Sequence, residues 1–297
     1  MAILSTKLLG KVAGKIERNE RLDEPADKLA EAANKALSAP WLVNLLSGSV
    51  AGHPLHPLFI ALPIGSWSTA LALDLLGDDD AARKSIGIGL VTTIPTVVTG
   101  VSDWRYTLKA ERRVGLVHAT SNVLAIAAYA GSWVARKADR RGLGVGLSLV
   151  GMGFVSYSGW LGGHLSYALG VGVDTTAFQH SQAEWTSVGW AEDVTVGETT
   201  LGDANGVPVV LTRTRTGDVV VLADRCTHRG GPLHEGGIVD GCLACPWHGS
   251  RFDLDGAVAQ GPANRPQQSY EVEVRDGQVY ARISDEPRAY RTNPVGV

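Results

Sequence analysis

Four apolar segments, each long enough to cross a bilayer, dominate the first half of this 297-residue chain. We place them at residues 57–76, 85–103, 114–134 and 142–163. A membrane-spanning helix needs about 20 mostly apolar residues, and the third and fourth segments contain no charged residue. The fourth is rich in glycine, which suits close helix packing in lipid. A water-soluble bundle is the alternative, but the apolar runs are long and the loops between them short. The pattern therefore predicts a four-helix transmembrane bundle within residues 50–175.

Residues 1–45 differ from the spans because they are charged and contain no continuous apolar core. Their apolar residues recur at helical spacing, and they lack the apolar run of a secretory signal. We expect an amphipathic helical segment that either lies on the membrane surface or packs on the protein.

Two short boxes mark the polar C-terminal third: Cys226-Thr227-His228 and Cys245-Pro246-Trp247-His248. Sixteen residues separate them, so the pattern reads C-x-H-x16-C-x2-H. Two thiolates on one iron and two imidazoles on the other can hold a [2Fe–2S] cluster, at a higher potential than a plant-type all-cysteine cluster. A zinc site also uses two of each ligand but usually groups its cysteines apart from its histidines. The spacing favours the cluster, and Cys242 is left without a thiol partner.

The run from Cys245 to Asp253 resembles the second ligand loop of Rieske ferredoxins and ring-hydroxylating oxygenases. The resemblance covers about residues 185–283 and implies a small antiparallel β domain, placed at residues 184–284, with the cluster at one tip. It also implies that Cys226 and Cys245 bind one iron and that His228 and His248 bind the other.

Quinol-oxidising Rieske proteins carry two further cysteines in a disulfide, and Gly231 and Trp247 occupy those positions here. Ser250 matches a serine that donates a hydrogen bond to the cluster, while Phe252 replaces a tyrosine that donates another. Because such hydrogen bonds tune the potential, the resemblance implies a potential between the ferredoxin and quinol-oxidase extremes.

The membrane half also resembles a bacterial family of four-helix membrane proteins without an established function, over about residues 50–175. The matching motifs are His53-Pro54-Leu55-His56-Pro57, Asp103-Trp104 and the segment 162–167. Some members are fused to Rieske domains. The expected fold class is therefore mixed: an N-terminal four-helix transmembrane bundle, a C-terminal all-β Rieske domain and a polar tail at residues 285–297.

Histidines of the membrane half form a second group of candidate ligands. Four spans place both termini on one face, where His53, His56, His118 and His164 all gather. Haem b needs two imidazoles at one depth on different helices, and His118 with His164 meets this requirement. The alternatives are interfacial histidines with a structural role, a non-haem metal site that includes Asp103, and a quinone pocket.

These features predict a membrane-anchored, one-electron Rieske carrier rather than a complete enzyme, with a redox partner protein and haem b or quinone in the membrane domain. The alternatives are a ferredoxin-like component of a separate oxygenase and a non-enzymatic redox sensor. Nothing in the composition or motifs indicates nucleic-acid binding. We expect a multi-pass protein of the bacterial cell membrane. Lysine and arginine counts in the loops mildly oppose a cytoplasmic cluster domain, whereas the N-terminus, in which we find no export signal, favours one. We expect the Rieske domain to be cytoplasmic.

Overall fold

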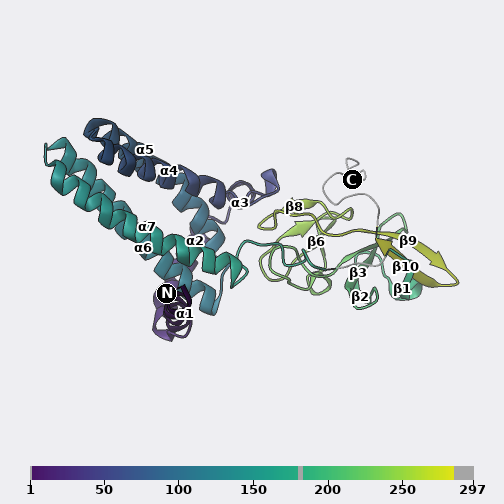
Figure 1. The fold of residues 1–297 in the computed structure, drawn as a ribbon. Coiled ribbons are helices and arrows are strands. Elements are labelled where there is room, and N and C mark those ends of the chain that lie inside the picture. The colour runs from purple at the N-terminus through teal and green to yellow at the C-terminus, as the bar shows by residue number, and fades with distance from the viewer. Residues whose placement is uncertain (1, 180–182, 284–297) are drawn as a thin grey trace. The chain divides into compact units, whose positions relative to one another are not determined.

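The computed structural model describes residues 2–179 and 183–283, so the polar tail expected at residues 285–297 lies outside the described part (Figure 1). The chain divides into two compact units. The first contains Met1–Ser38 and Leu55–Gly172, and the second contains Ala39–Pro54 and Val173–Val297. The segment expected as one N-terminal piece, residues 1–45, is thus shared between the two units.

Two long helical hairpins build the first unit: α4 (His56–Leu76) with α5 (Asp79–Trp104), and α6 (Lys109–Lys137) with α7 (Arg141–Tyr167). All four helices are long and apolar enough to cross a membrane, as predicted. They extend beyond the predicted spans because polar turns such as Asp79–Lys84 continue the helix outside the apolar core.

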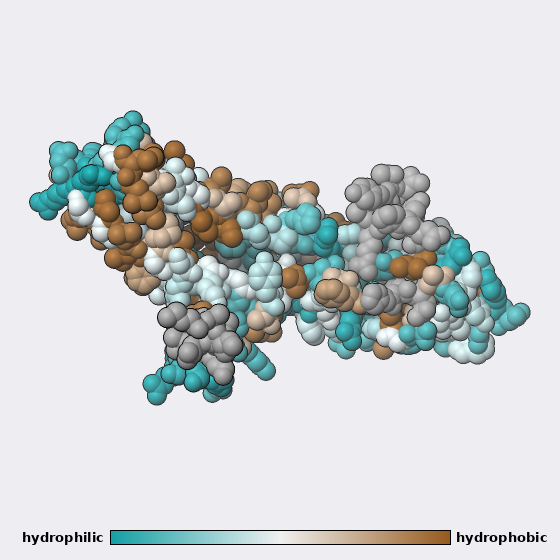
Figure 2. All heavy atoms as spheres, viewed as in Figure 1, coloured by the Kyte–Doolittle hydropathy of each residue, from teal (hydrophilic) through white to brown (hydrophobic). Residues whose placement is uncertain are grey.

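The outer surface of these helices is apolar, and their interior includes polar side chains beside an apolar cluster around Trp67 and Tyr129. Figure 2 shows hydrophobic side chains spread over the hairpins and hydrophilic ones at the hairpin tips. Leu75 is 84% exposed, whereas Ser132, Ser148 and Ser158 are buried. A water-soluble bundle would bury its leucines, so this distribution suits a lipid environment.

The N-terminal helices α1 (Ala2–Glu17) and α2 (Asp23–Ala36) pack on α6. Asp23 accepts two hydrogen bonds from Arg113, each 2.6 Å long. Arg112 donates to Asp27 over 2.6 Å. Of the two arrangements left open by the sequence, the structure therefore shows packing on the protein.

The second unit is mainly antiparallel β structure, preceded by the short helix α3 (Pro40–Ser47). One sheet has the order β1 (Thr186–Trp190), β10 (Gln278–Ile283), β9 (Tyr270–Arg275). Another runs β2 (Thr199–Asp203), β3 (Pro208–Arg213), β4 (Val219–Ala223). The third runs β5 (Ile238–Val239), β6 (Cys242–Ala244), β7 (Arg251–Phe252), β8 (Val258–Gln260).

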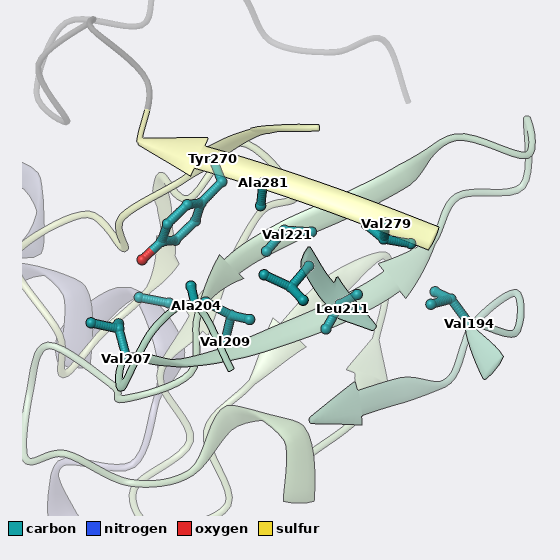
Figure 3. Close-up of a cluster of buried hydrophobic side chains, with 11 residues drawn as sticks. Val194, Ala204, Val207, Val209, Leu211, Val221, Tyr270, Val279 and Ala281 are labelled. Atoms are coloured by element: carbon teal, nitrogen blue, oxygen red, sulfur yellow. The ribbon is translucent and has the colours of Figure 1, made fainter. Parts of the chain in front are cut away.

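Two apolar clusters stabilise this unit. The first joins the first two sheets through Leu211, Val221 and Val279, all essentially inaccessible to solvent (Figure 3). The second contains Leu222, Leu243 and Phe252 together with two cysteines. The second cluster therefore supports the loops that carry the predicted ligands.

A buried ion pair offers a test of the helical unit. Arg136 donates to both carboxylate oxygens of Asp74 over 2.6 and 2.7 Å, and both side chains are nearly inaccessible. Arg136→Ala leaves a buried carboxylate uncompensated, so we expect the free energy of unfolding to fall by roughly 3–5 kcal/mol. Denaturant titration of the full chain in detergent measures this loss. Arg83→Ala, which breaks an exposed pair with Asp80, should change it little; equal losses in both variants would contradict the prediction.

Candidate iron–sulfur centre

The first ligand box lies in a tight loop after β4. The Cys226 N–H donates to the carbonyl of Gly231 over 2.9 Å, and the Gly230 N–H donates to the carbonyl of Cys226 over 2.8 Å. Gly230 has a φ of 74°, in the left-handed region that glycine adopts without strain. Backbone hydrogen bonds within the chain therefore define the shape of this loop.

The second box connects β6 to β7. The Cys245 N–H donates to the carbonyl of Ser250 over 2.8 Å, and the Gly249 N–H donates to the carbonyl of Cys245 over 3.1 Å. Pro246, Trp247 and Gly249 are exposed, whereas Cys245 and Ser250 are buried. The loop thus presents one face to solvent and keeps its cysteine inside.

The two loops bring the four predicted ligands together in like pairs. Cys226 and Cys245 are 1% and 4% exposed and hydrogen-bond to each other. The imidazoles of His228 and His248 lie edge to face, with ring centroids 5.1 Å apart. One side of the site therefore presents two sulfur atoms and the other presents two imidazoles.

Protonation of these groups suits metal binding. The hydrogen bond with Cys226 lowers the pKa of Cys245 to about 7, while the same bond, aided by burial, raises the pKa of Cys226. Burial, with the neighbouring His248, lowers the pKa of His228 to about 3. The His228 ring is therefore neutral near pH 7, the form in which imidazole binds metals.

The like pairing of the ligands is the feature that a two-iron Rieske site needs. Tetrahedral zinc instead needs four ligands around one point. A Rieske cluster needs two cysteines on one iron and two histidines on the other. The paired thiols and paired imidazoles meet that requirement.

Gly231 and Trp247 occupy the positions of the disulfide in quinol-oxidising Rieske proteins, and they complement each other in size. A Cβ atom at Gly231 would lie 2.8 Å from the Cys245 Sγ and 3.1 Å from the Trp247 ring. The indole therefore fills the space beside the glycine, and the loops pack together without a covalent link.

Ser250, the predicted tuning residue, is fully buried behind the second loop. Its Oγ accepts a hydrogen bond from the Ala263 N–H over 2.9 Å. The Ser250 hydroxyl can also donate its own proton, which is the hydrogen bond that the tuning role requires. Phe252 is also fully buried and has no hydroxyl.

Sequence reasoning missed residues outside the expected Rieske domain that support the ligand loops, either directly or through residues 261–263. Thr175 donates from its Oγ1 to the carbonyl of Cys226 over 3.1 Å. Asn44 accepts from the Gly261 N–H over 2.7 Å, and Ser49 donates to the carbonyl of Ala263 over 2.7 Å. Single polar residues in a short helix and a linker carry no sequence signal for such a role.

The membrane histidines do not all share one environment. His118 Nδ1 lies 2.8 Å from the carbonyl of Ser158, and His56 Nδ1 lies 3.0 Å from the carbonyl of Thr96. His164 Nε2 lies 2.8 Å from a carboxylate oxygen of Glu17, and its ring stacks on Trp160. His53 belongs to the second unit. The structure therefore gives His164 a different environment from His118, with which it was expected to pair.

Comparisons with known proteins agree with this division. Residues 184–271 match the family described as Rieske [2Fe-2S] domain, and residues 52–175 match that described as Predicted membrane protein (DUF2231). The anthranilate 1,2-dioxygenase ferredoxin subunit of Burkholderia cepacia is 32% identical over 103 residues, which cover 34% of this chain and 94% of the relative. The cytochrome b6-f complex iron-sulfur subunit 2 of a Nostoc species is 39% identical over 77 residues. That match covers 25% of this chain and only 43% of the relative.

One solved structure is also similar to part of this chain. The ferredoxin of carbazole 1,9a-dioxygenase from Nocardioides aromaticivorans is 24% identical, with a TM-score of 0.32. The match covers 34% of this chain and 98% of that one. The family matches and the Burkholderia relative show that the chain belongs to the Rieske [2Fe-2S] family through its C-terminal domain, and that residues 52–175 form a domain of the predicted membrane protein family DUF2231.

Proposed function

We propose that this protein is a membrane-anchored Rieske electron carrier, which passes one electron at a time between a redox partner protein and its membrane domain. The observation that carries the proposal is the pairing of two buried thiols with two adjacent imidazoles in one chain with four apolar helices. The relatives described as a ferredoxin subunit and as a cytochrome b6-f subunit support a carrier role.

In this proposal Cys226 and Cys245 hold one iron, and His228 and His248 hold the other. When bound, the [2Fe–2S] cluster supplies a one-electron redox couple. The chain's own residues set its surroundings: the buried cysteines keep one side dry, and Ser250 donates a hydrogen bond to the cluster. Trp247 is 55% exposed beside His248, which gives the partner protein an accessible face.

The membrane domain is proposed to anchor the carrier in the bacterial cell membrane, with the cluster domain in the cytoplasm. A second redox site in this domain, haem b or quinone, would give the electron a membrane acceptor or donor. Protease added to right-side-out spheroplasts should leave the Rieske domain intact and should digest it after lysis. Digestion before lysis would place the domain outside.

A ferredoxin-like component of a separate oxygenase is the second candidate function. The match to the Burkholderia ferredoxin subunit, which spans 94% of that protein, favours it. A soluble ferredoxin reductase that reduces the cluster rapidly would support this role, whereas reduction by a quinol would support membrane electron transfer. A redox sensor should react with neither.

Replacing any one ligand tests the cluster assignment. We expect Cys226→Ser, Cys245→Ser, His228→Ala and His248→Ala each to abolish the electron paramagnetic resonance (EPR) signal of the reduced cluster, because every iron needs both of its protein ligands. Cys242→Ser is the matched control, since Cys242 lies on β6 outside the ligand pairs. A normal signal in any ligand variant would refute the assignment.

Ser250→Ala tests the tuning hydrogen bond. Removing a donor worth about 1 kcal/mol should lower the midpoint potential by about 40 mV for one electron. Phe252→Tyr should raise the potential, because it restores a hydroxyl at a position where the resemblance implies a second donor. A redox titration followed by EPR measures both shifts, with the exposed Ser187→Ala as control. An unchanged potential in Ser250→Ala would contradict the role of Ser250.

A further inference from the structure

Two pairs of side chains join α4 to α6, and in each pair the residues are 62 positions apart in the sequence. Trp67 stacks on Tyr129, with ring centroids 4.1 Å apart and planes 11° from parallel. Asp74 is ion-paired with Arg136. Each pair joins a residue of the first hairpin to the residue 62 positions later in the second. Such self-matching contacts arise where two copies of one unit meet across a two-fold axis.

The buried face of α5 recurs on α7 with the same spacing. Five of the six residues buried on α5 follow this spacing: Ala82, Ile86, Gly89, Thr93 and Thr99. Adding 62 to each number gives a set of residues that are also buried. These residues are Gly144, Ser148, Gly151, Val155 and Leu161.

Contacts inside the hairpins repeat as well. A Cβ on Gly89 would meet the Trp67 ring at 2.3 Å, and a Cβ on Gly151 would meet the Tyr129 ring at 2.8 Å. In both hairpins the glycine lies 22 positions after the aromatic residue. The two hairpins therefore share an internal packing pattern.

Two histidines repeat at the same 62-residue interval. His56 Nδ1 faces the carbonyl of Thr96, and His118 Nδ1 faces the carbonyl of Ser158. In both hairpins the carbonyl belongs to the residue 40 positions after the histidine. A Cβ on Gly100 would lie 2.8 Å from the His56 ring. A Cβ on Gly162 would lie 3.3 Å from the His118 ring. His56 and His118 are thus equivalent positions, and each lies 11 residues, about three helical turns, before Trp67 or Tyr129, on the helix face that carries that stacked pair.

The hydrogen bonds assign the tautomer of both rings. A ring nitrogen that faces a carbonyl must carry the proton, so Nδ1 donates and Nε2 keeps its lone pair. At His118 a second bond gives the same answer, because the Asn122 amide nitrogen lies 3.0 Å from Nε2. Ser158 donates to the Asn122 Oδ1 over 2.8 Å, which orients that amide. A backbone carbonyl on Nδ1 is the usual outer partner of a metal-binding histidine.

A site with two histidines suits a metal tetrapyrrole in particular. In the described part of the chain no three His, Cys, Asp or Glu side chains group around one point, which disfavours a metal ion held by protein ligands alone. A metal tetrapyrrole supplies four equatorial nitrogens and needs only axial ligands from the protein. His164 is a poorer candidate because it is paired with Glu17 and its equivalent position is Ser102.

We propose that α4–α5 and α6–α7 are two copies of one helical hairpin about a pseudo-two-fold axis, and that His56 and His118 are the two axial ligands of a haem held at that axis. Both first helices run in the same direction, so the axis lies along the membrane normal. At His118 the Nε2 lone pair that would bind the haem accepts from the Asn122 amide in this structure. This inference rests on the membrane redox site of the proposed function and names its ligands.

Hemin titration of the purified full-length protein in detergent tests the proposal. We expect wild type to bind about one hemin per chain, with the EPR spectrum of bis-histidine ligation. His56→Ala and His118→Ala should each lose that spectrum, while the matched controls His53→Ala and His164→Ala keep it. Asn122→Ala should tighten binding, because no amide then competes for Nε2.

Separate readouts distinguish the possible failures. A wild-type protein that binds no hemin but shows a normal cluster signal would overturn this inference and leave the Rieske carrier intact. Loss of hemin binding in His164→Ala with retention in His56→Ala would also overturn it. Absence of the cluster signal from wild type would refute the proposed function instead. Because the wild-type EPR spectrum reports the ligand type directly, the proposal remains testable if a histidine variant fails to fold.

Discussion

The iron–sulfur site depends on one constraint: two loops that lie sixteen residues apart in sequence must place like ligands side by side. Backbone hydrogen bonds at Gly230 and Gly249 close these loops, and the apolar cluster around Leu243 and Phe252 anchors them to the sheets. The cysteines are members of that cluster, so folding of the β domain and formation of the site are one process. With Gly231 and Trp247 in place of a disulfide, packing and hydrogen bonds hold the two loops together.

The loops also receive support from segments that flank the membrane helices in sequence. Asn44 and Ser49 precede the first span and bond to residues 261–263, and Thr175 follows the last span and bonds to the first ligand loop. Ala263 in turn bonds to Ser250. The second unit therefore includes residues 39–54, beyond the Rieske match at residues 184–271, and a Rieske fragment cut at the family boundaries would lose these bonds.

Prediction from sequence succeeded where the signal was local. The cysteine–histidine boxes indicated a Rieske domain, and apolar length indicated the four spans. It could not show which histidines share an environment, because that depends on helix pairing across the bundle. The hairpin repeat was also hidden, since its paired positions hold different residues such as Asp74 and Arg136 or Trp67 and Tyr129. What the repeat preserves is burial and contact geometry, which become visible only in three dimensions.

The central claim is that one chain unites a two-iron cluster with a membrane domain. Its most direct test is the metal content of the full-length protein purified in detergent, measured together with EPR before and after reduction. The account predicts about two iron atoms and two acid-labile sulfides per chain and a Rieske signal that appears on one-electron reduction. About one zinc ion per chain, with no reducible signal, would contradict it.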